Sequence, residues 1–413
     1  MKELEHPDWV RRLNLFGDAV GDPRHLVGLD PAELLGLARE TTGLDDVGES
    51  EWPGWLETYE RHVAAIDADS HLHLLGRVLT RSEVLRVLQT WLRLQATWAA
   101  NGAITALSVD QPLFVVGPPR TGTTILFELL ALDPNLRAPL AYEALYPLAS
   151  MGSVERRLEL SQSEQEFWAD IHPPFMMMHE LASNLPCECV HFLMYDSAGP
   201  YWGMVYDAPS FTAWQLQHLD SVERVYRLHR RMLQTFQHEA PSTTNRWLLK
   251  SPFHVAALPA LFAEYPDARV IHTHRDPRKF MASLISILSA LRFMRSEEVD
   301  VAALAAVMEL TYQMFLEGAM TALQDGSAPS DRVAHSYFLD LMEDPVRSLH
   351  ATYDHLGMEW PAGHDRTITE YLAAKPKDKH GAHSYSLADV GLDEGSVRET
   401  FKNYVGHYGI REE

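Results

Sequence analysis

The chain has 413 residues, of which 46% are hydrophobic and 22% charged, an ordinary composition for a globular protein. Its formal net charge of −22 at pH 7 argues against DNA, RNA and anionic membrane surfaces as partners, because each of them needs a basic face. An anionic ligand must therefore be held locally, by a few cations and backbone amides that work against the overall field.

Residues 1–105 are predicted to be helical. Asp30 and Pro31 provide the cap and the first-turn proline of a helix, and apolar residues then recur at a spacing near 3.6. The segment 81–99 repeats that spacing, with an apolar stripe that includes Trp91. We expect these helices to form an N-terminal region.

Four short apolar segments beyond this region have the pattern of buried strands. Strands that alternate with helices predict an α/β fold, in which helices flank a central parallel sheet on both faces. We expect this α/β domain to occupy residues 106–413. The connection at about 140–244 is longer than a crossover needs and predicts an inserted helical lid or substrate region. The predicted strands are 113–116, 246–249, 269–273 and 333–337.

A turn rich in glycine, proline and threonine, residues 117–124, joins the first strand to a helix; we call it the phosphate loop. Its backbone N–H groups and the positive end of the helix dipole favour a bound phosphate. Gly122 permits a positive φ and a close approach to the ligand, and Thr124 offers a hydroxyl donor. The spacing is that of a Walker A loop, but Thr123 replaces the lysine and the cation is Arg120. The loop therefore suits an anion other than a nucleoside triphosphate.

A second anion site is predicted at the end of the strand 269–273. Asp276 as N-cap and Pro277 at the first helical position begin a helix that places Ser283 two turns in. Arg275 then projects from the carboxyl end of a strand, where doubly wound sheets bind ligands. Two separate phosphate sites are what a nucleotide phosphorylated at both its 3′ and 5′ positions needs.

These segments resemble a known family. The sequence Pro-Arg-Thr-Gly-Thr-Thr at 119–124 resembles the 5′-phosphosulfate loop of the sulfotransferases, and 275–283 resembles their 3′-phosphate motif, with arginine and serine eight positions apart. The segment 250–253 resembles the stretch just upstream of that motif, and 337–345 resembles a later strand-to-helix segment near the nucleotide. The segments follow the family's order, and the helical N-terminal region resembles its bacterial-type branch.

The resemblance implies a P-loop sulfotransferase fold and in-line transfer of a sulfuryl group from 3′-phosphoadenosine 5′-phosphosulfate (PAPS), without a catalytic metal. The product nucleotide would be adenosine 3′,5′-bisphosphate. Arg120 and Lys250 would neutralise the sulfuryl oxygens, and Arg275 and Ser283 would hold the 3′-phosphate. Arg120 stands where many relatives have lysine, and Thr121 replaces the more usual serine. The further nucleotide contacts that the resemblance implies are Pro119, Thr121, Gly122, Thr123, Thr124, Tyr337 and, from a faint echo of a basic-glycine loop, Lys379 and Gly381.

Transfer to a hydroxyl is helped by a general base near the acceptor oxygen, and three candidates stand out. Glu143 follows Arg120 by 23 residues and resembles the glutamate base of protein-tyrosine and several bacterial sulfotransferases; a helix-capping or salt-bridged glutamate is the alternative. His254 follows Lys250 by four positions. Its place at the start of a helix favours a role in orienting other groups. His179 lies in the inserted region. Glu143 is the preferred candidate.

The acceptor is predicted from two stretches of the inserted region that are rich in methionine and aromatic residues, 175–179 and 201–206. Such stripes are more often plain core, but they also line apolar pockets of adjustable shape. In that case the acceptor is an apolar small molecule or lipid that carries a hydroxyl.

Two other functions stay open. A P-loop kinase or nucleotidase would require Mg-ATP, and the missing loop lysine speaks against it. A non-catalytic nucleotide-binding protein would keep the phosphate sites without the chemistry, and the presence of both Lys250 and Glu143 speaks against that.

The compartment is predicted from the cysteines and from the absence of targeting signals. Cys187 and Cys189 suit neither a disulfide framework nor, without further ligands, a zinc site, so we expect packing roles and a reducing compartment. Residues 1–10 lack a signal-peptide pattern, and the apolar stretch 280–291 is too short to span a bilayer. We expect a cytoplasmic protein without a transmembrane segment, and a homodimer is compatible with this sequence.

Overall fold

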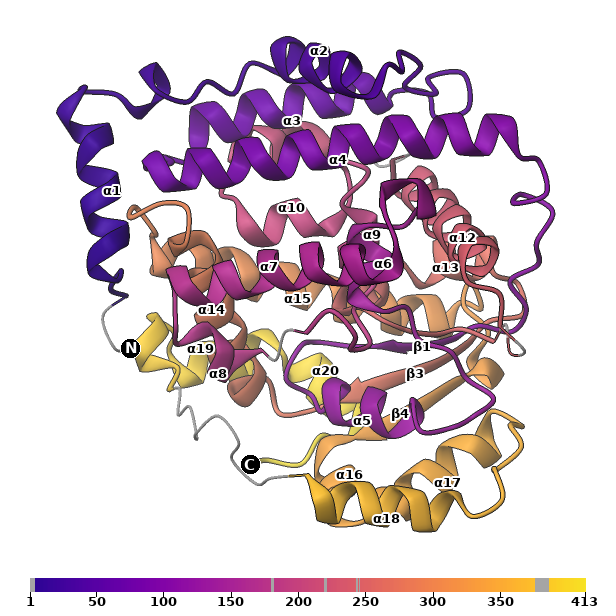
Figure 1. The fold of residues 1–413 in the computed structure, drawn as a ribbon. Helices are drawn as coiled ribbons and strands as arrows, with labels where there is room; N and C mark the ends of the chain where they lie inside the picture. Colours follow the sequence, from indigo (N-terminus) through magenta and orange to yellow (C-terminus); the bar gives the residue numbers. More distant parts are fainter. Residues whose placement is uncertain (1–3, 180–181, 219–220, 243, 245, 376–385) are drawn as a thin grey trace.

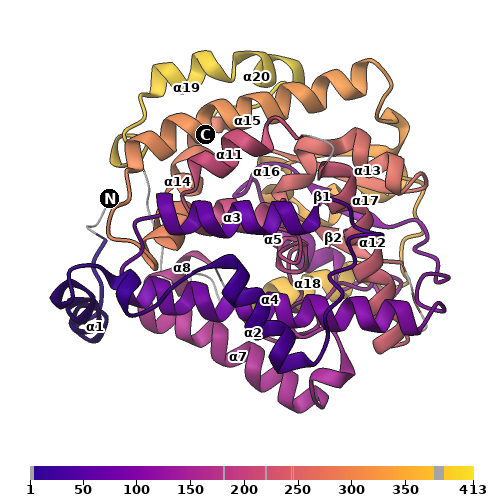
Figure 2. The ribbon, with the colours of Figure 1, turned by 90° about the horizontal axis from the view of Figure 1, so that it is seen from above.

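The computed structural model describes residues 4–179, 182–218, 221–242, 244, 246–375 and 386–413, and Figures 1 and 2 show it from two directions. At its centre is a four-stranded, all-parallel sheet in the order β2-β1-β3-β4. All four strands lie within two residues of their predicted positions, so the predicted α/β fold is confirmed. The strands are β1 Leu113–Val116, β2 Leu248–Lys250, β3 Arg269–His274 and β4 Val333–Tyr337.

Strand β1 is buried on both faces, as its unbroken apolar sequence predicts. Because side chains alternate along a strand, Phe114 and Val116 join one core, and Leu113 and Val115 join another on the opposite face. The smaller core packs under the sheet against α5 Thr123–Leu130, α16 Phe338–Glu343, α17 Pro345–His355 and α18 His364–Ala374 (Figure 1).

The N-terminal helices form a layer on the other side, with α4 running across the molecule (Figure 1). The predicted helices at 30–38 and 81–99 lie within α2 and α4, and the Asp30 side chain caps α2 by accepting a hydrogen bond from the backbone of Glu33 at 2.8 Å. Trp91 of α4 stacks on Trp55 at 4.8 Å and belongs to the same continuous core as Phe114. The helices are α1 Asp8–Ala19, α2 Pro31–Thr42, α3 Trp55–Asp69 and α4 Leu74–Ala100.

The long connection between α5 and β2 is helical, as predicted, and lies between the N-terminal layer and the sheet (Figure 1). Its aromatic stretch 201–206 packs inside the larger core, which favours the plain-core interpretation of that stretch. The helices are α6 Ala141–Leu145, α7 Val154–Ile171, α8 Phe175–Met178, α9 Val190–Leu193, α10 Pro200–Val205, α11 Pro209–Gln215 and α12 Ser221–Glu239.

The remaining helices lie below the N-terminal layer in the view of Figure 1, and α15, α19 and α20 lie along one edge of the molecule in Figure 2. The apolar stretch 280–291 is the buried middle of α14. Among the helices of the described ranges, none is both long enough and apolar enough to cross a bilayer. These helices are α13 Leu258–Glu264, α14 Pro277–Phe293, α15 Val301–Gln324, α19 Glu394–Thr400 and α20 Lys402–Tyr408, and the 3-10 turns are Pro23–His25, Ala149–Met151, Pro252–Ala257, Ser330–Arg332 and Ala388–Val390.

Candidate functional site

The phosphate loop leaves β1 in a conformation that L-residues rarely adopt. Gly117 has φ +129°, Arg120 has φ +67°, and Gly122, the N-cap of α5, has φ +86°. A Cβ on Gly117 would lie 2.4 Å from Oγ1 and 2.6 Å from the carbonyl oxygen of Thr273, so the loop is pressed directly against β3. Glycine is therefore needed at 117 both for the backbone angle and for the close approach.

Replacing Gly117 with alanine is expected to destabilise the protein by about 2 kcal/mol and to weaken nucleotide binding, because the loop must move off Thr273. Chemical denaturation and titration with adenosine 3′,5′-bisphosphate measure the two effects. Gly102→Ala is the matched control, since an added Cβ there meets nothing within 4 Å. Equal stability of the two variants would contradict this account.

Hydroxyl groups hold the loop in place. Thr121 is 1% exposed and donates a hydrogen bond to the carbonyl of Pro118 at 2.6 Å. Its Oγ1 also lies 2.6 Å from Oγ1 of Thr273, which donates to the carbonyl of Val116 at 3.1 Å. The Thr121 hydroxyl thus supports the shape of the loop, and the loop is tied to the ends of β1 and β3. Of the other predicted loop residues, Arg120 and Thr124 are exposed, Pro119 and Gly122 are half-buried, and Thr123 is buried.

Lys250 reaches the phosphate loop from the neighbouring strand β2. Its side chain is 5% exposed, and Nζ lies 3.5 Å from Oγ1 of Thr124 and 5.3 Å from the centre of the Phe127 ring. The register that pairs Val115 with Lys250 sets this position. A lysine thus stands at the loop although the loop itself carries none, because a parallel neighbour of β1 supplies it.

Glu188 is a site residue that the sequence analysis missed. Its Oε1 lies 3.0 Å from Nζ of Lys250 and 3.8 Å from Nε2 of His179. The backbone N–H of Cys189 donates to the carbonyl of Lys250 at 2.9 Å and so fixes the segment against β2. Burial favours a raised pKa for the Glu188 carboxyl, but Lys250 and His179 outweigh it and hold the pKa well below its usual range. Glu188 therefore stays ionised and links His179 to Lys250.

A signal for Glu188 is present in the sequence, in the run Cys-Glu-Cys-Val at 187–190. A carboxylate within such an apolar run is buried, and a buried carboxylate requires a cation. The identity of that cation depends on a contact between distant parts of the chain, and the spacing of residues in the sequence does not reveal it.

The contacts of Glu143 are those of a structural residue. One carboxylate oxygen accepts a hydrogen bond from the backbone N–H of Leu140, the N-cap residue of α6, at 3.0 Å. The other oxygen pairs with Arg137 at 3.3 Å, and the residue is 7% exposed. Both oxygens are thus engaged, and the capping alternative is the one that this geometry favours.

His254 is buried on the face of the sheet to which Phe114 points. Its Nδ1 lies 2.9 Å from the hydroxyl of Tyr226, its ring packs edge-on against Phe114, and burial lowers its pKa to about 3. A neutral, fully enclosed imidazole fits the orienting role that the sequence favoured. His179, in contrast, keeps 35% of its side chain exposed and lies beside Glu188.

The segment predicted to hold a second anion lies at the end of β3, and its strand, cap and helix follow one another as predicted. Asp276 caps α14 by accepting from the backbone of Arg278 at 2.9 Å, and Ser283 is buried two turns along the helix. The Arg275 guanidinium stacks on the ring of Phe338 at 3.7 Å and donates from Nη1 to the carbonyl of Arg120 at 2.8 Å. This hydrogen bond joins the two anion sites directly.

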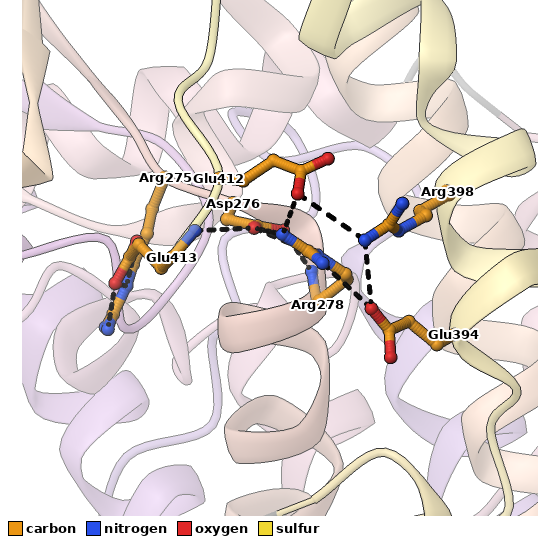
Figure 3. Close-up of polar contacts among 7 residues, drawn as sticks. All are labelled: Arg275, Asp276, Arg278, Glu394, Arg398, Glu412 and Glu413. Atoms are coloured by element: carbon orange, nitrogen blue, oxygen red, sulfur yellow. Dashed lines mark hydrogen bonds and ion pairs between the residues drawn. The ribbon is translucent and has the colours of Figure 1, made fainter.

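The remaining donors of Arg275 point to a carboxylate. Nε lies 2.9 Å from Oε1 of Glu413, and Nη2 lies 2.8 Å from its Oε2 (Figure 3). This geometry demonstrates that the guanidinium is presented to an anion. Tyr337 ends β4 next to this site as the N-cap of α16, and the predicted contacts Lys379 and Gly381 lie outside the described residues.

Comparisons with known proteins agree with this geometry. The sequence pattern of the sulfotransferase family matches residues 112–362, which span all four strands and both anion sites. The chain belongs to the sulfotransferase family. It is therefore an enzyme that transfers a sulfuryl group from a sulfate donor, and the resemblance seen in its four motifs is confirmed.

Two solved sulfotransferases share the fold over nearly the whole chain. The sulfotransferase STF1 from Mycobacterium tuberculosis is 28% identical with a TM-score of 0.76, and the alignment covers 91% of this chain and 100% of that one. The sulfotransferase STF9 from Mycobacterium avium is 22% identical with a TM-score of 0.78, covering 93% and 97%. Because these alignments exceed 90% of this sulfotransferase, they extend into the helical N-terminal region.

A curated relative has a named substrate. Omega-hydroxy-beta-dihydromenaquinone-9 sulfotransferase Stf3 from Mycobacterium bovis is 25% identical over 325 residues, which cover 73% of this chain and 75% of the relative. The match confirms the bacterial-type branch of the family.

Proposed function

We propose that this sulfotransferase uses PAPS and transfers the sulfuryl group to the hydroxyl of an apolar small molecule or lipid. The observation that carries the donor is the position of Lys250 Nζ, 3.5 Å from Thr124 in a phosphate loop that has no lysine of its own. A cation at this position would neutralise the sulfuryl group that is attached to the 5′-phosphate. The loop does not need the lysine with which an ATPase binds a triphosphate. Arg275, held on Phe338 and already bound to a carboxylate, supports a second phosphate at the 3′ position.

The residues fit the two ends of this donor. The backbone N–H groups at the start of α5 and the side chain of Arg120 would bind the 5′-phosphosulfate, and Arg275 and Ser283 would hold the 3′-phosphate. When bound, the nucleotide supplies the sulfuryl group that is transferred. Lys250 then stabilises negative charge on the sulfuryl oxygens and the bridging oxygen, where charge develops as the acceptor oxygen bonds to sulfur and the bond to the phosphate breaks.

For the general base we propose His179 in place of Glu143. His179 is partly exposed, and the ionised Glu188 beside it favours the protonated imidazole that forms when the acceptor hydroxyl gives up its proton. Glu188 also pairs with Lys250, so the base and the sulfuryl-binding cation share one carboxylate. The engaged oxygens of Glu143 and the enclosed ring of His254 support this choice.

His179→Asn is expected to slow transfer about 100-fold with adenosine 3′,5′-bisphosphate binding unchanged, since only the proton acceptor is lost. Glu143→Gln is the matched comparison: it is expected to keep most of the activity but to unfold at a lower temperature, because it removes the charge that pairs with Arg137. Labelled-sulfate transfer and thermal unfolding measure both. A folded but inactive Glu143→Gln protein, beside an active His179→Asn protein, would restore Glu143 as the base.

The acceptor proposal rests on the surroundings of His179 and on the named relative. Met178 of α8 packs on the apolar core immediately before His179, and the ring of Phe175 stacks parallel to the imidazole at 6.4 Å. A relative named for a menaquinone-type lipid supports a lipid hydroxyl. The experiment is labelled-sulfate transfer to long-chain alcohols, hydroxylated isoprenoids and monosaccharides, and the proposal requires the apolar acceptors to be preferred. Stabilisation by Mg-ATP and not by adenosine 3′,5′-bisphosphate would refute the donor.

We also infer that the enzyme works in a reducing compartment such as the cytoplasm. Cys187 and Cys189 are both buried free thiols, and this state supports that location.

A further inference from the structure

Residues 411–413 lie across the second anion site and are held there by charged side chains (Figure 3). Arg411 pairs with Asp340, and Glu412 approaches Arg278 at 3.5 Å. The backbone N–H of Glu413 donates to the carboxylate of Asp276 at 3.2 Å, and Asp276 is the residue that caps α14. The segment is therefore anchored on both sides of Arg275, and Glu413 is positioned with little freedom.

The contact between Glu413 and Arg275 uses the edge of the guanidinium that a phosphate would need. Nε and Nη2 both donate to the Glu413 carboxylate, and Nη1 donates to the carbonyl of Arg120. The two side chains are 12% and 21% exposed, so the pair is mostly shielded from water. Paired N–H donors meeting two oxygens is also the way in which arginine binds phosphate. The carboxylate and a 3′-phosphate thus require the same atoms.

We propose that Glu413 is an internal competitor of the 3′-phosphate, which lowers the affinity of the site for 3′-phosphorylated nucleotides. This inference rests on the proposed use of PAPS. A nucleotide with a 3′-hydroxyl offers no negative charge to replace the carboxylate, so it leaves Glu413 paired with Arg275 and its affinity does not depend on that pair. A 3′-phosphate brings a larger charge and more acceptors, and it restores the pairing of Arg275. Glu413 thereby lowers the affinity of nucleotides that carry a 3′-phosphate and leaves the affinity of 3′-hydroxyl nucleotides unchanged.

The test is titration of the full chain with two probes, adenosine 3′,5′-bisphosphate and adenosine 5′-monophosphate, by calorimetry at fixed ionic strength. Glu413→Gln keeps the shape of the side chain and removes its charge. It is expected to bind the bisphosphate about tenfold more tightly than the unmodified protein, because binding no longer displaces a charged partner. Its affinity for the monophosphate is expected to change by less than about twofold, because that probe does not contact Arg275.

The matched control is Glu370→Gln, which neutralises an exposed glutamate on α18 that faces Arg366. It is expected to leave both affinities unchanged. Bisphosphate binding that is equally tight or weaker in Glu413→Gln would overturn the competitor role while leaving the donor proposal intact. A tenfold gain for both probes would overturn the assignment of the competition to the 3′-phosphate. Failure of the unmodified protein to bind the bisphosphate at all would refute the proposed donor, and the competitor role with it.

Discussion

Replacing Lys250 with methionine is expected to lower the rate of sulfuryl transfer about 100- to 1,000-fold and to change adenosine 3′,5′-bisphosphate binding little. The reason is that Nζ lies 3.5 Å from Oγ1 of Thr124, where we propose that the sulfuryl group is held and where charge would develop during transfer. The product nucleotide lacks the sulfuryl group, so its binding depends mainly on the loop and on Arg275. Single-turnover transfer of labelled sulfate and calorimetric titration with the bisphosphate measure the two quantities.

The control for this prediction must separate the loss of the lysine from the effect on its partner Glu188. In Lys250→Met its carboxylate is left buried without its cation, which destabilises the fold. The double variant Lys250→Met/Glu188→Gln removes both charges and is expected to fold well and still to transfer slowly. Lys402→Ala, which breaks only an exposed pair with Glu399, is expected to transfer at the normal rate. Recovery of activity in the double variant would mean that Lys250 serves the fold and not the chemistry.

The free energy of unfolding is expected to fall steeply as the pH drops below about 6.5. Burial lowers the pKa of His62, His254 and His272 to about 3 in each case. In the unfolded chain these imidazoles take up protons near pH 6.5, whereas in the folded protein they stay neutral until about pH 3. The unfolded state therefore binds more protons between these values, and three such groups together cost about 4 kcal/mol per pH unit.

Urea denaturation at pH 7.5, 6.5 and 5.5 measures this dependence. His62 is the best probe, because it packs against Trp202 and Phe211 away from the phosphate loop. His62→Phe is expected to reduce the slope by about 1.4 kcal/mol per pH unit, since one titrating group is removed. His25→Asn, at an exposed position, is expected to leave the slope unchanged. A flat profile down to pH 5.5 would show that these histidines are not held neutral.

The parts of the site that the sequence predicted correctly are those set by neighbours in the chain. The strand, turn and helix order around residues 117–124 and the cap formed by Asp276 depend on contacts a few residues apart, and the sequence displays them. Glu143 follows the same rule. Its capping partner Leu140 is only three residues away, so the sequence already offered helix capping as the alternative to a catalytic role.

The parts that were missed depend on distant pairs. Glu188 and Lys250 lie 62 positions apart, and only the folding of the inserted region against β2 brings them together. The aromatic stretch 201–206 was ambiguous for a similar reason. The hydroxyl of Tyr206 bonds to Glu83 of α4 at 2.9 Å, so what looks like pocket lining in the sequence is an anchor between the inserted region and the N-terminal layer.

One strand, β3, determines the separation of the two anion sites. Thr273 fastens the phosphate loop, and Arg275, two residues later, donates to the carbonyl of Arg120 within that loop. Pairing of β3 with β1 holds both contacts in register before any ligand binds. If both proposed sites bind the nucleotide, we expect one whose two charged ends are closer together or farther apart to engage a single site and to lose the affinity of the other.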